Sequence, residues 1–347
     1  MGFPEPVDRP SKAGNGRSAG NPEGVVMTNR TRTRALGTAL VLLFAAGRAW
    51  AAMMPIPKTE LDRGSDVIVT GRVTSLNSYW NSDHTLIYTD VSIQPEEFIK
   101  GRVHRNVVVK VIGGEVGEMS LVVEDMPVFS HGEQVTVNLV KGRDEGVFEV
   151  LGGEQGKTPT LGGKPKPPPP QFYYDYRGYK RDPAVCNYYI NQGLLDKGWE
   201  AALQRAGDSW SLAGSAFSFR DSGATGIKAA ALDGVNIISD SDFGASSSYW
   251  AVNYWYIRRK KVVENDIIFN TRPTWYTYLE DYCPSDGGDV QAIACHEMGH
   301  SLILYDLRET YQSEQTMYWA VYRGETKKRS LDFGDIDGIR FIYPAGR

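Results

Sequence analysis

Two histidines four residues apart, His296 and His300, constrain the fold of this chain more than any other feature. Side chains at this spacing lie on one face of a helix, so both imidazoles can reach a single metal ion. Glu297 stands beside the first histidine, where a carboxylate can hold a water next to that ion and take its proton. The spacing predicts a helix over 290–302 that carries a metal site.

A third protein ligand requires the chain to turn back after this helix. Asp306 follows His300 by six residues and could supply a carboxylate oxygen. On a continuous helix Asp306 would lie about 9 Å further along the axis, at ~1.5 Å per residue, and on a different face. We therefore expect the helix to end before Asp306. Three protein ligands with one open position are typical of catalytic zinc. Other oxygen donors further along the chain are Glu309, Glu314 and Glu325.

The stretch from His296 to Asp306 resembles the zinc-binding motif of the metzincin proteases. Met317, in the segment Gln315-Thr316-Met317-Tyr318, stands where that family has its methionine turn, and Leu331–Tyr343 is similar to the last helix of the matrixin branch. The resemblance covers Asp182 to Tyr343. It implies a zinc endopeptidase with His296, His300 and Asp306 as ligands, Glu297 as general base and Met317 beneath the metal.

The same resemblance implies a fold for residues 182–347, namely a metzincin-like domain with a twisted mixed sheet and long helices. It also implies that the strand around Tyr249–Tyr256 is a sheet edge that receives an extended peptide substrate. The sequence departs from the family at Ile303, where the family has a glycine that lets the backbone turn. A β-branched residue in a left-handed conformation is strained by about 1–2 kcal/mol or more.

The predicted elements of this second domain follow the order that the resemblance implies. Apolar residues at helical spacing predict a helix over 197–210, and a final helix is expected over 332–342. Strands are predicted at 186–191, 216–220, 235–238, 251–257 and 263–269. The predicted fold class is therefore α+β.

Residues 53–160 have a different pattern, because apolar and polar residues alternate in short runs separated by glycine-containing turns. This pattern predicts an antiparallel β-module, a small barrel or sandwich. Its predicted strands are 67–73, 86–93, 106–112, 120–123, 134–139 and 147–151. We interpret it as a binding or folding module, with an inhibitory pro-region as the alternative. Matrixins often block their zinc with a pro-segment cysteine, and this module contains no cysteine.

Two segments are not predicted to form domains. Successive prolines make residues 161–181 an extended linker. Residues 1–52 are interpreted as a non-native leader followed by a signal peptide that starts at Met27. Three arginines precede the apolar run 35–46, and small residues follow it at the cleavage positions. The mature protein is therefore expected to be secreted or periplasmic, without stable membrane insertion.

Composition narrows the partners. A net charge of −4 gives no indication of a basic surface, so we do not expect nucleic acid as a partner. We expect a monomer that acts on a protein or peptide. Calcium is a second metal that the acids Asp240, Asp242, Asp286 and Asp289 could hold. Cys186 and Cys283 could form one disulfide. Two other functions remain open: a secreted zinc- or peptide-binding pseudoprotease, and a surface-binding protein whose activity lies in the β-module.

Overall fold

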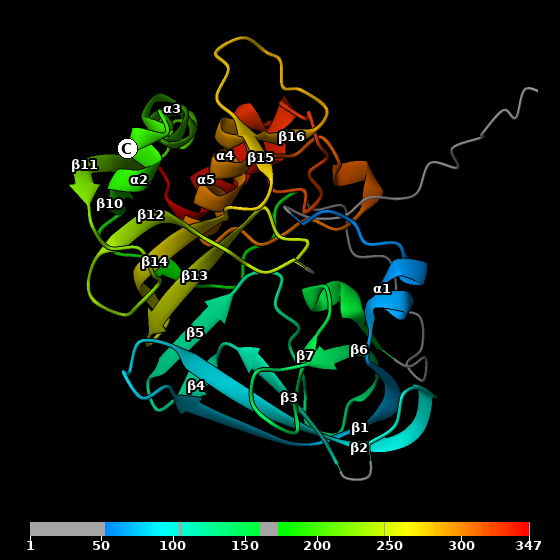
Figure 1. The fold of residues 1–347 in the computed structure, drawn as a ribbon. Helices are drawn as coiled ribbons and strands as arrows, with labels where there is room; N and C mark the ends of the chain where they lie inside the picture. The colour runs from blue at the N-terminus through cyan, green and yellow to red at the C-terminus, as the bar shows by residue number, and fades with distance from the viewer. Residues whose placement is uncertain (1–52, 104–105, 160–172, 246, 347) are drawn as a thin grey trace, which may run out of the picture. The chain divides into compact units, whose positions relative to one another are not determined.

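A computed structural model describes residues 53–103, 106–159, 173–245 and 247–346 (Figure 1). The predicted leader and signal peptide, residues 1–52, lie outside these ranges, as does the first part of the predicted linker. No helix in the described part of the chain is long and apolar enough to cross a membrane.

Five strands between residues 67 and 150 form a closed barrel. Its order is β1-β2-β3-β7-β6, and pairing of β6 with β1 closes it. Buried valine and isoleucine alternate with polar residues along these strands, so one face of each strand lines the core of the barrel. The pairings are antiparallel except that of β3 with β7, which is parallel. The strands are β1 (Val67–Trp80), β2 (Ile87–Lys100), β3 (Val107–Ile112), β6 (Gln134–Lys141) and β7 (Val147–Val150), with β8 (Lys157–Pro159) added beside β6.

The second half is organised around a mixed sheet whose main path runs β11-β10-β12-β14-β13-β5-β4. Strands β10, β11, β12 and β14 are parallel to one another, whereas β13 is antiparallel to β14. The strands are β4 (Gly114–Val116), β5 (Met119–Val123), β10 (Val185–Asn191), β11 (Ser218–Thr225), β12 (Asn236–Ser241), β13 (Ala251–Arg258) and β14 (Lys261–Asn270). Three short strands complete the set: β9 (Lys180–Arg181) beside β14, and the pair β15 (Thr274–Tyr276) and β16 (Gly287–Asp289).

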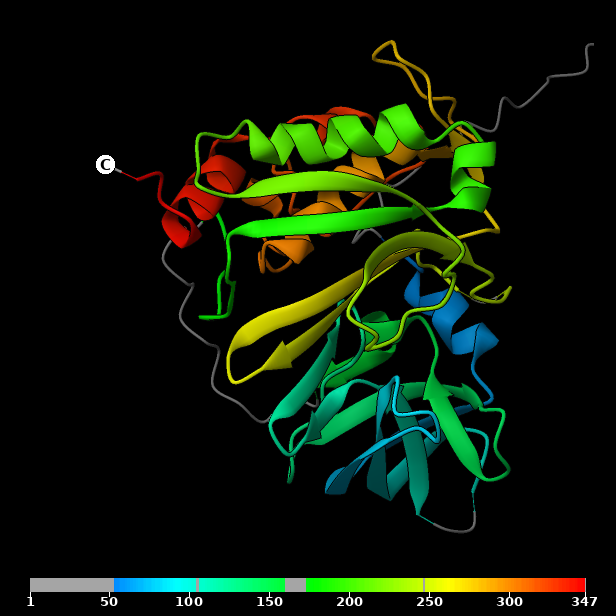
Figure 2. The same cartoon turned by 90° about the vertical axis from the view of Figure 1, so that its left-hand side faces the viewer.

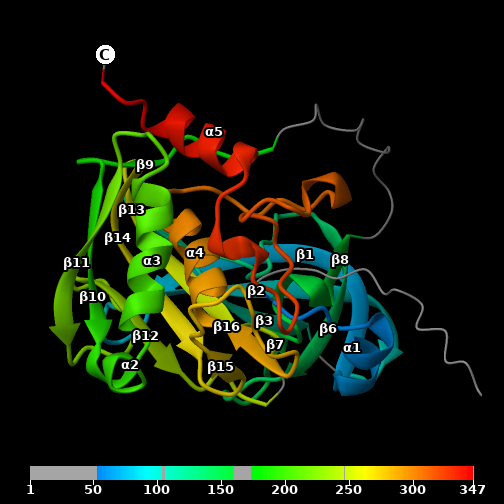
Figure 3. The same cartoon turned by 90° about the horizontal axis from the view of Figure 1, so that it is seen from above.

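Helices α3 (Glu200–Ser211) and α4 (Val290–Ser301) lie side by side above the strands, as Figure 3 shows. The indole N–H of Trp210 on α3 donates to the carbonyl of Cys295 on α4 at 2.7 Å, which ties the two helices together. The barrel lies on the other side of β13 and β14 (Figure 2). The remaining helices are α1 (Lys58–Gly64), α2 (Gln192–Asp196) and α5 (Phe333–Ile342), with 3-10 turns at Gly153–Gly156, Thr310–Gln312 and Lys327–Arg329.

The predicted fold class is wrong. Strands account for about 40% of the structure and helices for about 20%, so the described residues do not form the metzincin-like domain with long helices that we expected. The longest helices, α3 and α4, have 12 residues each. A barrel is present, but β4 and β5 of the predicted β-module belong to the sheet of the second half. Local periodicity identifies strands without specifying their partners, so the sequence did not predict that β4 and β5 would pair with strands of the second half.

The sheet edge that we expected to receive a peptide substrate is occupied by another strand of the chain. Strand β13 is paired along its outer side by β5, with Tyr254 opposite Val123 and Arg258 opposite Met119. The end of the predicted linker is likewise engaged, because β9 pairs with β14 and Asp175 forms a bridge with Tyr305.

Candidate metal centre

Helix α4 is the central element of the site. The Asp289 carboxylate caps its N-terminus by accepting from the Ala292 amide at 2.7 Å. Residues all round the helix are buried, as expected of a helix enclosed by the core. On its sheet side, Asn253 of β13 donates to the Glu297 carbonyl at 2.7 Å and to Ser301 Oγ at 2.9 Å. The helix is therefore held on the side of α3 and on the side of β13.

The chain turns sharply where α4 ends. Ile303 has a φ of 72°, the left-handed conformation that usually requires glycine. The Leu304 amide bonds the Gly299 carbonyl at 3.2 Å, and the Ile303 amide bonds the His300 carbonyl at 2.8 Å. These bonds close the helix C-terminus and send the chain back along α4. The predicted reversal before Asp306 is thus made with isoleucine in the position of the family's glycine.

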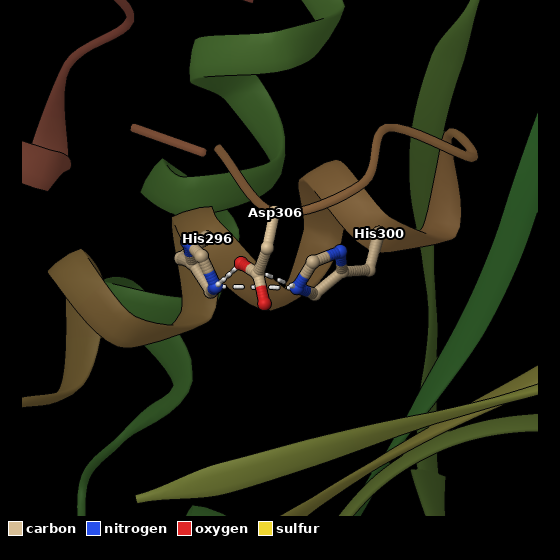
Figure 4. A group of neighbouring side chains, drawn as sticks. All are labelled: His296, His300 and Asp306. Carbon is tan, nitrogen blue, oxygen red and sulfur yellow. Dashed lines mark hydrogen bonds and ion pairs between the residues drawn. The ribbon is translucent and has the colours of Figure 1, made fainter. Parts of the chain in front are cut away.

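This turn brings Asp306 to the two histidines (Figure 4). His296 Nε2 lies 3.1 Å from His300 Nε2 and 3.3 Å from Asp306 Oδ1. His300 Nε2 lies 3.7 Å from the same oxygen. Donor atoms about 2.1 Å from a tetrahedral zinc are about 3.4 Å apart, so the three separations fit one zinc ion. Among the described residues, His296, His300 and Asp306 form a group of three side chains that could hold a metal ion.

The far nitrogen of each imidazole is bonded to the backbone. His296 Nδ1 donates to the Thr316 carbonyl at 2.7 Å, and His300 Nδ1 donates to the Leu304 carbonyl at 2.8 Å. Each Nε2 is then an unprotonated acceptor, and two acceptors 3.1 Å apart repel unless a cation lies between them. Both carboxylate oxygens of Asp306 are buried without a hydrogen-bond donor. These four unsatisfied atoms fit a divalent cation.

Protonation states at the site suit metal binding. Burial lowers the pKa of His296, and burial together with the charge of His296 lowers the pKa of His300 to about 3. Burial alone would raise the pKa of Asp306, but the adjacent imidazoles of His296 and His300 and the charge of Arg308 hold it below its ordinary range. At neutral pH the site therefore offers two neutral imidazoles and one carboxylate.

Glu297 is as deeply placed as the ligands. Its side chain is 2% exposed, and its Oε2 is buried without a hydrogen-bond donor. Burial, followed by the charges of Asp306 and Glu124, raises the pKa of Glu297 well above its ordinary value. The alternative oxygen donors are engaged elsewhere: Glu309 in the cap of a 3-10 turn, Glu314 with Lys327, and Glu325 with Lys327 and the Tyr322 amide.

Met317 packs against α4 at Gly299. A Cβ at Gly299 would lie 2.1 Å from Met317 Sδ, so this glycine lets the methionine approach α4 closely. The Met317 and Thr316 amides both donate to the Asp335 carboxylate, at 3.1 and 2.7 Å. Asp335 on α5 thereby positions the carbonyl that orients His296.

Sequence reasoning missed three residues around the site. Asp335 had a weak signal, because Asp332 and Asp335 have capping-box spacing at the start of α5. Lys328 lies in a run of basic residues that predicts a solvated surface. It is nevertheless fully buried, and its ammonium donates to the carbonyls of Thr316, at 3.0 Å, and Tyr318. Burial lowers the pKa of Lys328 to about 8. Arg308 gave no signal in the sequence.

The predicted calcium acids are not gathered into one site in the described residues. Each has a protein partner instead: Asp240 pairs with Lys197 and Lys228, Asp242 with Arg272, Asp289 with Arg329, and Asp286 accepts from Tyr276. The three cysteines are buried free thiols, so Cys186 and Cys283 do not form a disulfide in this structure.

Comparison with known proteins identified no relative of this chain. No family model matches this chain, and no curated protein is significantly similar to it. The assignment to metzincins therefore remains a prediction from the motif.

Proposed function

We propose that this chain is a secreted zinc-dependent endopeptidase with Glu297 as its general base. The observation that carries the proposal is the triangle of His296 Nε2, His300 Nε2 and Asp306 Oδ1, whose sides of 3.1, 3.3 and 3.7 Å match one tetrahedral zinc. Carbonyl bonds to both Nδ1 atoms support it, because they leave the two Nε2 lone pairs for the metal.

Bound zinc would act as a Lewis acid that polarises the scissile carbonyl and the attacking water. His296, His300 and Asp306 would hold the metal and leave one position open for these groups. Glu297 would accept a proton from the water while the water oxygen bonds to the carbonyl carbon. It would then return that proton to the amine nitrogen as the carbon–nitrogen bond breaks. The turn at Ile303 and the packing of Met317 against α4 would keep the ligands in place between steps.

A second candidate, a zinc-binding protein without turnover, is favoured by the burial of the site. His296, His300 and Glu297 are at most 2% exposed, so a polypeptide cannot reach them in this conformation. The two candidates share the metal and differ in whether hydrolysis occurs.

The decisive experiment measures zinc content and hydrolysis on the same samples of the mature chain. We expect one zinc per chain. The zinc should be lost in His300→Ala. It should be retained in the control Glu309→Ala, because Glu309 lies shortly after the site in sequence but is not a proposed ligand. Cleavage of unfolded casein should fall about 10²–10⁴-fold in Glu297→Gln with zinc still bound. A chain without zinc would contradict both candidates. Zinc bound without cleavage would favour the second.

Secretion is part of the proposal and rests on residues 27–52, which lie outside the described structure. When the chain is expressed with its native N-terminus, we expect a protein whose sequence begins near Met53 to be released into the medium or periplasm. Recovery of the uncleaved chain from the cytoplasm would contradict this part.

A further inference from the structure

A cavity of about 620 Å³ lies between the barrel and strand β13, within the range of about 300–1,000 Å³ that is typical of small-molecule sites. Alternation along β13 assigns its two faces, because Asn253 bonds helix α4 and the ring of Trp255 lies 5.9 Å from that of His300. Val252 and Tyr254 therefore face the other way, and both line the cavity. Strand β13 thus separates the cavity from the candidate metal centre.

The opposite wall of the cavity is the outer face of the barrel. Thr89 and Val91 of β2 are buried, so the alternation of a strand turns Tyr88 outward. Tyr88 is paired with Tyr79 of β1 and with Ile112 of β3, and all three side chains line the cavity. The rings of Tyr79 and Tyr88 are stacked, with centroids 6.4 Å apart. This wall is therefore a continuous aromatic surface where a solvent-facing strand usually carries polar residues.

Two tyrosine hydroxyls in the cavity are available to a ligand. Within the described part of the chain, the hydroxyls of Tyr88 and Tyr254 make no hydrogen bond. By contrast, Tyr79 donates to Asp90 at 3.1 Å, and Tyr249 donates to a backbone carbonyl at 2.9 Å. Burial and the neighbouring Tyr88 raise the pKa of Tyr254 to about 12, so its hydroxyl keeps its proton. Each of the two hydroxyls can both donate and accept a hydrogen bond.

The charged side chains of the cavity have both signs. Lys110 forms an ion pair with Asp144, and its ammonium lies 5.8 Å from the centre of the Tyr88 ring. Arg143 and Glu149 are exposed and form no ion pair with the described residues. Among the described residues that line the cavity, two are basic and three are acidic. A polyanion such as nucleic acid needs a basic surface, so this wall does not suit one.

A neutral oligosaccharide matches the aromatic wall, the free hydroxyls and the mixed charges together. The C–H face of a sugar ring packs against an aromatic ring, and sugar hydroxyls both donate and accept hydrogen bonds. An apolar ligand would leave the hydroxyls and charged groups of the walls without partners. An extended peptide binds by adding to a free strand edge. Here β6 pairs with β1 to close the barrel, and β5 pairs with β13.

We propose that the cavity between the barrel and β13 binds a short neutral oligosaccharide. Its sugar rings would lie on Tyr79 and Tyr88, and its hydroxyls would bond the hydroxyls of Tyr88 and Tyr254. The site goes beyond the proposed hydrolysis, because its lining includes neither Glu297 nor any of the three proposed metal ligands.

Calorimetric titration of the full mature chain tests the inference with maltohexaose, cellohexaose, mannohexaose and chitohexaose. We expect at least one of these neutral sugars to bind with a Kd of about 1 mM or tighter. An oligothymidylate represents a polyanionic ligand and should not bind. The inference is overturned if none of the sugars binds, or if the oligonucleotide binds in their place.

Tyr88→Ala removes the central ring of the barrel wall, so it should weaken binding of the sugar about tenfold or more. The side chain faces outward, and circular dichroism checks that the fold is retained. Tyr278→Ala is the matched control, because Tyr278 is 45% exposed and lies outside the cavity. Its sugar affinity should equal that of the wild type. Equal losses in the two variants would place binding on exposed tyrosines in general and contradict the inference.

The β13 wall is tested by Tyr254→Phe, which keeps the ring and removes one hydroxyl. Loss of a hydrogen bond to the sugar should weaken binding about two- to tenfold. Tyr256→Phe is the control on the same strand, because Tyr256 is fully buried and does not line the cavity. A Tyr254→Phe protein with wild-type affinity would show that the sugar does not lie between the barrel and β13, which would overturn the inference.

Discussion

Asp335 accepts a 2.7 Å hydrogen bond from the amide of Thr316, and the Thr316 carbonyl in turn accepts the Nδ1 proton of His296. The last helix of the chain thus orients a proposed ligand 39 residues before it through a single intervening residue. Asp335 is fully buried, and its second oxygen accepts from Met317. The orientation of the metal site is consequently sensitive to a residue that contacts no metal.

Replacing Asp335 by asparagine should weaken zinc binding by about 10–100-fold. The change places an N–H₂ group against backbone amides that need an acceptor, so we also expect a loss of about 1–3 kcal/mol in the free energy of unfolding. Competition with a fluorescent chelator measures the affinity, and urea titration measures the stability. Asp337→Asn is the control, because Asp337 is exposed on the same helix. Equal zinc affinity in the two variants would show that Asp335 does not orient His296.

Ile303 combines a strained backbone with a fully buried side chain. It packs in a cluster with Trp255, Ile257 and Tyr305. Truncating a buried isoleucine costs about 2–5 kcal/mol, whereas a glycine would relieve about 1–2 kcal/mol of strain. Packing is the larger effect, so Ile303→Gly should lower the free energy of unfolding by about 1–3 kcal/mol.

Ile303→Ala separates the two contributions, because alanine loses the packing and keeps the strain. Urea titration should show the glycine variant about 1 kcal/mol more stable than the alanine variant, the reverse of the usual order. If alanine is the more stable of the two, the left-handed conformation at this position is not strained.

Gly299→Ala should destabilise the protein although alanine is the better helix former. The added Cβ would lie 2.1 Å from Met317 Sδ and 2.7 Å from the ring of Trp210, and both side chains are buried. Overpacking costs about 1–3 kcal/mol, against about 1 kcal/mol gained in helix propensity. At 2.1 Å the overlap is severe, so we expect a net loss together with weaker zinc binding.

Gly207→Ala on α3 is the matched control for Gly299. Its nearest neighbour to the added Cβ is 3.2 Å away, so its stability should stay within about 1 kcal/mol of the wild type. Thermal unfolding of the two variants side by side provides the comparison. A Gly299→Ala protein as stable as Gly207→Ala would show that Met317 can move away without cost.

Stability should fall as pH rises because of Asp266 on β14. Burial raises the pKa of Asp266 to about 8, although its oxygens accept from the amides of Ala231 and Ile237. Since the folded-state pKa lies above the unfolded one, the contribution of Asp266 is fully present below about pH 4 and is lost as pH rises through about 8. Burial raises the pKa of Glu264 to about 7, which gives the same sign.

The measurement is the free energy of unfolding between pH 5 and 8, expected to fall by up to about 2.7 kcal/mol per pH unit, about 1.4 for each of the two groups. Asp266→Asn removes one of the two titrating groups, so its slope should be shallower than that of the wild type. A variant with the wild-type slope would mean that Asp266 is ionised in the folded protein throughout this range.

Local pattern predicted much of the chain correctly. The six predicted strands of the first half correspond to β1, β2, β3, β5, β6 and β7, with ends that differ by a few residues, and the predicted helices correspond to α3, α4 and α5. The spacing of His296 and His300 determines their common face, since it depends only on helix geometry. The need for a reversal before Asp306 also followed from helix geometry, and Ile303 makes that turn.

The sequence by itself determined the proposed ligand residues and the helix that carries two of them, because both depend on neighbours within about ten residues. Only the tertiary structure decided that β5 pairs with β13, that Arg308 joins Asp306 to Asp125, and that Asp335 positions Thr316. Apart from Arg308 and Asp306, which are two positions apart, these contacts join residues 19 to 183 positions apart. Hydrophobic periodicity specifies which face of an element is buried, whereas the identity of its partner depends on how all the elements pack together.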